Sequence, residues 1–173
     1  MNKKTKKQLY ALYVRNFIFG VEDSLVSTVG LLSGVATAGA GKGIIILAGV
    51  VLIFVEAFSM GAGSLLSEHS VREYLDRKKS NKKIEIKAGI IMFFSYLLTG
   101  LIPLFPYLIW APKQALIASI VLSLVSLMIL GYISAKMLKI GVIHKILEMA
   151  IIGGIAILIG VIIGSWVETL VFS

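Results

Sequence analysis

The sequence predicts an all-α integral membrane protein with five transmembrane helices, and three observations support this fold class. Of the 173 residues, 58% are hydrophobic and only 15% are charged. The mean hydropathy is +0.96, whereas soluble domains contain roughly 45–50% apolar residues. Five apolar stretches each supply the about 20 residues that one helical crossing needs. A soluble globular protein is therefore excluded, and little chain remains for a separate domain.

The five expected spans follow one another closely along the chain. They cover residues 17–39, 44–67, 86–110, 114–135 and 146–167. A basic tail at 1–16 precedes this 17–168 transmembrane domain, a short basic loop lies at about 68–85, and a tail at 169–173 follows. Pro103, Pro106 and Pro112 predict a broken helix and a tight turn at the end of the third span.

Positive charge alternates with the spans. Fifteen of the 17 Lys and Arg residues lie in the N-terminal tail, between the second and third spans, or between the fourth and fifth. Only Lys42 and Lys113 lie on the other side. The positive-inside rule then places the N-terminus in the cytosol and the C-terminus outside. The net charge of +8 is thus a topology signal rather than a sign of nucleic-acid binding.

The composition and motifs of the sequence give little support for an enzyme. The absence of cysteine excludes disulfides, thiolate metal sites and iron–sulfur clusters. The two histidines lie near the expected cytosolic edge, no Ser, His and Asp set falls within one span, and no phosphate loop follows Gly61 and Gly63. We therefore expect no catalytic residues, no permanently bound cofactor and no enzymatic activity.

Three carboxylates lie well inside the expected spans, Glu22, Asp23 and Glu56, whereas Glu148 lies at the start of the fifth. A charged residue at the centre of a membrane helix costs about 2.5–3.5 kcal/mol on insertion scales, so each marks a candidate functional site. Asp23 shares a face of small and polar residues, which permits close helix contact. Glu22 lies on a mainly apolar face, seven residues after Arg15, and can extend toward that residue or the interface.

Glu56 and Met60 are four residues apart and share one face of the second helix. Ionised carboxylates bind divalent cations and release them when protonated, so such a group can exchange metal for protons. A neighbouring thioether shifts the preference toward a softer metal such as iron(II). Packing is the alternative role for a methionine at helical spacing.

Two further groups near the cytosolic edge are candidate metal sites. Glu68, His69 and Glu73 are candidates for the place where metal enters from the cytosol, although Glu68 and Glu73 each precede an arginine by four residues, the spacing of a solvated ion pair. His144 and Glu148 are also four apart, but Lys145 and Glu148 offer a simple ion pair.

Small residues also predict helix contacts. Gly30 with Gly34, and Gly160 with Gly164, form Gly-x-x-x-Gly motifs. Such motifs let helix backbones approach closely, either within the chain or across a dimer interface.

Residues 15–36, RNFIFGVEDSLVSTVGLLSGVA, resemble the first-helix signature of the vacuolar iron transporter family, and residues 59–63, SMGAG, resemble its second-helix signature. The resemblance implies a homodimeric transporter that moves iron(II), and often manganese(II), out of the cytosol in exchange for protons. By that resemblance Asp23 and Met60 match the pathway aspartate and methionine of the family.

The chain departs from the family pattern in several places. Glu22 stands where Asn or Ser is common, and Ser24 where Gly is common. The second-helix glutamate of the family lies two turns before the methionine, where this chain has Leu52, whereas Glu56 lies one turn before it. The loop between the second and third spans is too short for a glutamate-rich cytosolic metal-binding domain. The chain therefore resembles the membrane-only members.

The leading hypothesis is a proton-coupled exporter of iron(II), with manganese(II) as a further substrate, in a cell or organelle membrane. Its partners are the lipid bilayer, a second copy, metal ions and protons, but no nucleic acid. Asp23, Glu56 and Met60 would form the metal pathway, with Glu22 beside it. A membrane-embedded interaction or sensor protein, and an organic-cation transporter, remain as alternatives because both also place charges inside a bilayer.

Overall fold

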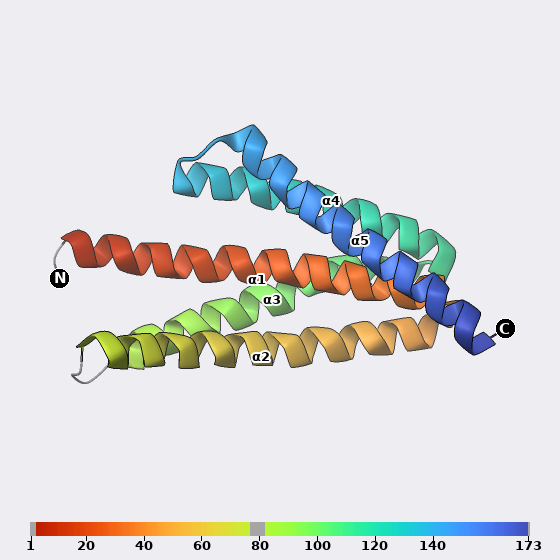
Figure 1. Ribbon diagram of the computed structural model, residues 1–173, viewed down its shortest axis with the longest axis horizontal. Coiled ribbons are helices and arrows are strands. Elements are labelled where there is room, and N and C mark those ends of the chain that lie inside the picture. Colours follow the sequence, from red (N-terminus) through yellow and green to blue (C-terminus); the bar gives the residue numbers. More distant parts are fainter. Residues whose placement is uncertain (1–2, 77–81, 173) are drawn as a thin grey trace.

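Five long α-helices make up the computed structural model, which describes residues 3–76 and 82–172 (Figure 1). They are α1 (Lys3–Thr37), α2 (Lys42–Asp76), α3 (Lys82–Ile109), α4 (Pro112–Leu138) and α5 (Val142–Phe172). Each contains a segment long and apolar enough to cross a membrane. The predicted fold class, an all-α membrane protein with five spans, is confirmed.

The helices extend beyond the apolar stretches from which they were predicted. Helix α1 includes most of the expected N-terminal tail, and α2 and α3 include most of the expected 68–85 loop. Lysine, glutamine and glutamate are good helix formers, so helical structure continues where apolar character ends. Hydropathy locates the part of a helix inside the bilayer and not its ends.

The expected break in the third span is wrong. Helix α3 continues through Pro103 and Pro106 to Ile109, and the chain turns only before Pro112. Both internal prolines are buried, and the Ser119 hydroxyl of α4 donates a hydrogen bond of 2.7 Å to the Pro103 carbonyl. Membrane helices tolerate proline where neighbouring helices and hydroxyl side chains compensate for the disturbed backbone bonding. Pro112 instead occupies the first turn of α4, where its missing N–H is harmless.

Two connections are tight turns with left-handed residues. After α1, Gly39 has a φ of 74°, a conformation that glycine adopts without steric cost. After α4, Lys139 has a φ of 57° and its N–H bonds the Ala135 carbonyl. These short turns make α1 antiparallel to α2, and α4 antiparallel to α5.

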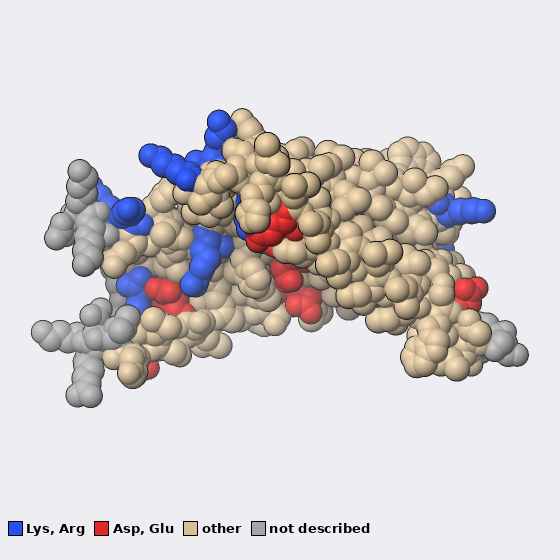
Figure 2. Space-filling view, turned by 45° about the horizontal axis from the view of Figure 1, so that its top comes forward, with Lys and Arg blue, Asp and Glu red and all other residues tan. Residues whose placement is uncertain are grey.

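Helix α1 lies at the centre of the arrangement. It contacts α3 and α5 extensively and α2 and α4 less, and it lies between an α2–α3 pair and an α4–α5 hairpin that also meet where α3 packs on α4 (Figure 1). The start of α1, the end of α2, the start of α3 and the α4–α5 turn lie toward one end of the molecule. This end carries most of the basic residues and is called the basic end below (Figure 2).

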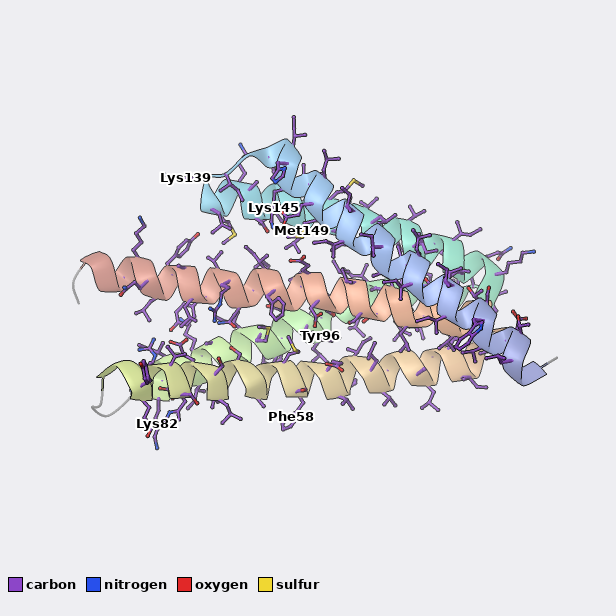
Figure 3. All side chains as sticks on the ribbon, in the orientation of Figure 1. Phe58, Lys82, Tyr96, Lys139, Lys145 and Met149 are labelled. Carbon is purple, nitrogen blue, oxygen red and sulfur yellow. The ribbon has the colours of Figure 1, made fainter. Side chains whose placement is uncertain are left out.

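Apolar side chains cover the outward faces of the helices. Phe58 on α2 is 71% exposed and points away from the other helices (Figure 3). One core cluster joins α1, α4 and α5 around Leu25 and Met149, and another joins α1, α2, α3 and α4 around Leu32 and Ile53. Apolar residues both inside and outside are the pattern of helices immersed in lipid. The protein is a multi-pass integral membrane protein.

Candidate functional site

A polar stripe on α1 defines the candidate site. Asn16, Gly20, Asp23 and Ser27 are spaced by four, three and four residues, so their side chains share one helical face. Contacts from this stripe reach α2 and α3. The sequence therefore places a line of polar groups along the middle helix of the bundle.

Asp23 and Glu56 come together near the middle of this stripe. Both side chains are partly buried, and the two carboxylates are near enough to interact electrostatically although they belong to different helices. Neither forms an ion pair with a basic residue in the described part of the chain. Two neighbouring carboxylates without a counter-charge repel each other and attract a cation.

Tyr96 of α3 completes this part of the site, and sequence reasoning missed it. The side chain is fully buried, interacts electrostatically with Asp23 and Glu56, and is labelled in Figure 3. Its hydroxyl lies 2.6 Å from the Ser27 hydroxyl, while the Ser24 hydroxyl donates a 2.6 Å hydrogen bond to the Tyr96 carbonyl. A lone tyrosine in an apolar span carries no signal of which helix it faces.

The stripe continues toward the basic end. The buried Asn16 side chain accepts a 2.8 Å hydrogen bond from the Ser64 hydroxyl of α2. Met92 of α3 packs at Gly20, where an added Cβ would lie 3.1 Å from the methionine sulfur. Met60 is partly buried one turn after Glu56, between the acidic pair and Ser64 along α2. Oxygen and thioether groups thus follow one another along the α1–α2–α3 contact.

Glu22 points to the opposite side of α1. It lines a pocket of about 360 Å³ together with Arg15 and with Lys145 of α5. Its carboxylate interacts electrostatically with Lys145, Glu148 and Asp23. Arg15 lines the same pocket but forms no ion pair with Glu22 in the described part of the chain, so the approach of Glu22 to Arg15 stays a prediction. The interaction of Glu22 with α5 was not predicted from the sequence.

The cytosolic metal candidates do not gather into one group. Glu68 accepts a 2.8 Å bond from Arg72, whereas His69 lies 3.0 Å from the buried Glu85 and 3.9 Å from Glu73. Among the residues that the structure describes, no three His, Asp or Glu side chains are placed to hold a metal ion. The ion pair expected for Glu68 is confirmed, but it is partly buried rather than solvated. The partner expected for Glu73, Arg77, lies outside the described residues.

Lys145 and Glu148 form the simple ion pair that their spacing allows, at 2.9 Å. His144 beside them is exposed. The alternative of a His144–Glu148 metal site therefore has no geometric support.

The two Gly-x-x-x-Gly motifs pack against each other within the chain, where α1 crosses α5. A Cβ on Gly34 would lie 2.8 Å from the Gly160 carbonyl oxygen, and one on Gly164 would meet the Gly34 backbone. Helices α1 and α5 thus cross with their backbones nearly touching, which only glycine permits. Of the two alternatives for these motifs, helix contact inside the chain is observed.

Comparison with known proteins gives a consistent result. The model of the VIT family matches residues 14–88 and 79–165. The chain is 25% identical to vacuolar iron transporter 1 of Eucalyptus grandis, with 83% of this chain and 82% of the relative covered. It is likewise 25% identical to vacuolar iron transporter 1 of Arabidopsis thaliana, with 83% and 81% covered, and 24% identical to a vacuolar iron transporter of Centaurea cyanus, with 83% of both covered.

These relatives are longer within the matched region. The match extends over 203 residues, whereas 83% of 173 is about 144, so roughly 60 positions have no counterpart in this chain. In this chain α2 ends at Asp76 and α3 begins at Lys82, which leaves no room for a domain between them. Because the family match covers most of the chain and both signature segments, the chain belongs to the VIT family.

Proposed function

We propose that the protein is a proton-coupled transporter, not an enzyme, that exports iron(II), and also manganese(II), from the cytosol. The observation that carries this proposal is the pairing of Asp23 and Glu56 inside the bilayer without a basic partner among the described residues. Intramembrane acids that face a neighbouring helix are typical of ion and proton pathways. The names of the relatives, which describe iron transporters, support a metal as the substrate.

The chemistry of the pair suits exchange. Two carboxylates carry two negative charges, which one divalent cation or two protons neutralise equally. Binding of two protons would therefore release one metal ion without leaving net charge in the low-dielectric interior. Met60 adds a soft sulfur ligand that favours iron(II) over magnesium or calcium. Glu22 would attract cations beside this pathway.

The orientation of the protein follows from its charges. With the basic end in the cytosol, the N-terminus is cytosolic and the C-terminus is outside, as the positive-inside rule requires. Asn16 and Ser64 then lie on the cytosolic side of the acidic pair, where metal would arrive. Protons from an acidic exterior would reach the pair from the other side.

The protein is proposed to act as a homodimer. A groove of about 520 Å³ runs between α1 and α5, lined by Ser27, Leu31 and Ile159 among others. A second copy would cover this groove and shield Ser27, the last residue of the polar stripe, from lipid. Because the chain has no cysteine, Ile159→Cys provides a clean crosslinking probe, with lipid-facing Ile117→Cys on α4 as the control. Crosslinking of both variants equally would contradict pairing through this groove.

Transport is tested by reconstituting the purified protein in liposomes. Iron(II) and manganese(II) flux is measured with and without an imposed pH gradient, for the wild type, Asp23→Asn and Glu56→Gln, with the exposed Glu73→Gln as a matched control. Flux that rises with the gradient, disappears in the first two variants and persists in the control supports the proposal. Absence of metal flux in the wild type overturns it and favours the sensor or organic-cation alternatives.

A further inference from the structure

The pocket between α1 and the α4–α5 hairpin contains charges that the proposed pathway does not use. The hairpin diverges from α1 toward the basic end and approaches it at the glycine crossing (Figure 1). The pocket of about 360 Å³ lies in this divergence and is lined by Arg15, Glu22 and Lys145, with Val14, Ile18 and Leu138 as apolar walls.

Lys145 is the cation in this pocket that forms an ion pair. Its side chain is 16% exposed, and its Nζ lies 2.9 Å from the Glu148 Oε1. It interacts electrostatically with Glu22 across the pocket. Figure 3 shows Lys145 near the start of α5, between the hairpin and α1. The Lys145 ammonium group therefore interacts with two carboxylates, Glu148 of α5 and Glu22 of α1.

The four acids in this region differ in their counter-charges. Glu148 pairs with Lys145, Lys145 lines one pocket with Glu22, and Glu22 directly precedes Asp23 on α1. Electrostatic interactions of Glu22 with Glu148, and of Asp23 with Glu56, link these four carboxylates, which are called the acidic row below. Figure 2 shows acidic side chains gathered near the middle of this face. Lys145 stands at the α5 end of the row, while the Asp23 and Glu56 end has no basic partner in the described residues.

We infer that Lys145, held by its ion pair with Glu148, is a tethered cation at the α5 end of the acidic row and lowers the apparent affinity of Asp23 and Glu56 for a divalent ion. This inference rests on the proposed transport function. A fixed positive charge near a cation site lowers the local concentration of divalent ions, because electrostatic repulsion grows with the charge of the ion. The ion pair with Glu148 partly neutralises the charge of Lys145 and so weakens this repulsion. Lys145 is a positioning residue and not a metal ligand.

The inference makes opposite predictions for the two members of the ion pair. Lys145→Met removes the tethered cation and should lower the KM for metal by about 2- to 5-fold, the size expected for one partly exposed charge interaction. Glu148→Gln removes the carboxylate that neutralises Lys145, so its positive charge acts fully on Glu22 and the pathway. This variant should raise the KM for metal by a similar factor. Lys145→Arg keeps the charge and should leave the KM within twofold of the wild type. A gain in apparent affinity cannot result from misfolding.

The experiment measures manganese(II) uptake into proteoliposomes over a range of metal concentrations at constant pH, with rates normalised to incorporated protein. Opposite shifts of KM in Lys145→Met and Glu148→Gln, both reduced at high salt, support the tethered cation. Wild-type flux with an unchanged or raised KM in Lys145→Met overturns the inference while the proposed function stands. No flux in the wild type overturns the proposed function and with it this role.

Discussion

The Tyr96 hydroxyl of α3 lies 2.6 Å from the Ser27 hydroxyl of α1. This hydrogen bond joins two helices one turn from Asp23, in a region where Tyr96 also interacts with Glu56 of α2. A single buried tyrosine therefore ties α3 to α1 beside the proposed metal pathway, and α3 also packs extensively against α2. Its position suggests that the acids are held in place by α3, which contributes no carboxylate to the pair.

Tyr96→Phe should lower stability by about 1 kcal/mol, because it removes this hydrogen bond and leaves the Ser27 hydroxyl without its partner. Tyr107→Phe is the matched control. Tyr107 is equally buried on the same helix, but its hydroxyl has no hydrogen-bond partner among the described residues. Its removal should be neutral or stabilising. Thermal unfolding of both variants in one detergent measures the difference, and equal effects would show that the Tyr96–Ser27 bond contributes nothing.

Met60→Leu tests the thioether separately from the size of the side chain. Leucine fills a similar volume, so the packing cost should stay below about 1.5 kcal/mol. Loss of the sulfur should reduce iron(II) uptake more than manganese(II) uptake, because manganese relies more on oxygen ligands. The measurement is the ratio of the two uptake rates in the same vesicles. Met137→Leu on α4 is the control, and the same ratio in both variants would remove Met60 from the site.

The sequence predicted the number and type of the helices because each span carries a long apolar signal. It also predicted Asp23 and Glu56 as site residues, since a carboxylate in a membrane helix is costly wherever it faces. It did not predict that Tyr96 bonds Ser27, one turn from Asp23, or that Lys145 lines one pocket with Glu22. Both contacts depend on helix rotation and packing, and helices that are apolar on all sides give no periodicity from which rotation can be derived.

The ends of the helices show the same limit. Hydropathy predicted a loop at 68–85, whereas His69 belongs to α2, Glu85 belongs to α3, and the two side chains meet at 3.0 Å. Sixteen residues separate them in the chain. Spacing rules that consider one helix at a time paired His69 with Glu73, and they could not include a residue from the neighbouring helix.

Gly160→Ala should destabilise the fold by about 1–3 kcal/mol, because its methyl group would collide with the Gly30 backbone at the α1–α5 crossing. Gly154→Ala on the same helix is the control. A Cβ at Gly154 meets nothing within 4 Å, so this variant should gain up to about 1 kcal/mol from helix propensity. Thermal unfolding in detergent compares the two. If Gly160→Ala were as stable as Gly154→Ala, the close crossing of α1 and α5 would be refuted.

His69→Ala should lower stability by about 1–3 kcal/mol, because it leaves the Glu85 carboxylate buried without its only described partner. Glu85 is 3% exposed, and its second oxygen already lacks a hydrogen bond in the described structure. Adding Glu85→Leu to His69→Ala should recover part of the loss, since replacing both partners of a buried polar pair by apolar groups can be nearly neutral. Glu73→Ala should change stability by less than about 0.5 kcal/mol, because its side chain is exposed and 3.9 Å from His69. Equal stabilities of His69→Ala and Glu73→Ala would mean that the His69–Glu85 contact does not hold the basic ends of α2 and α3 together.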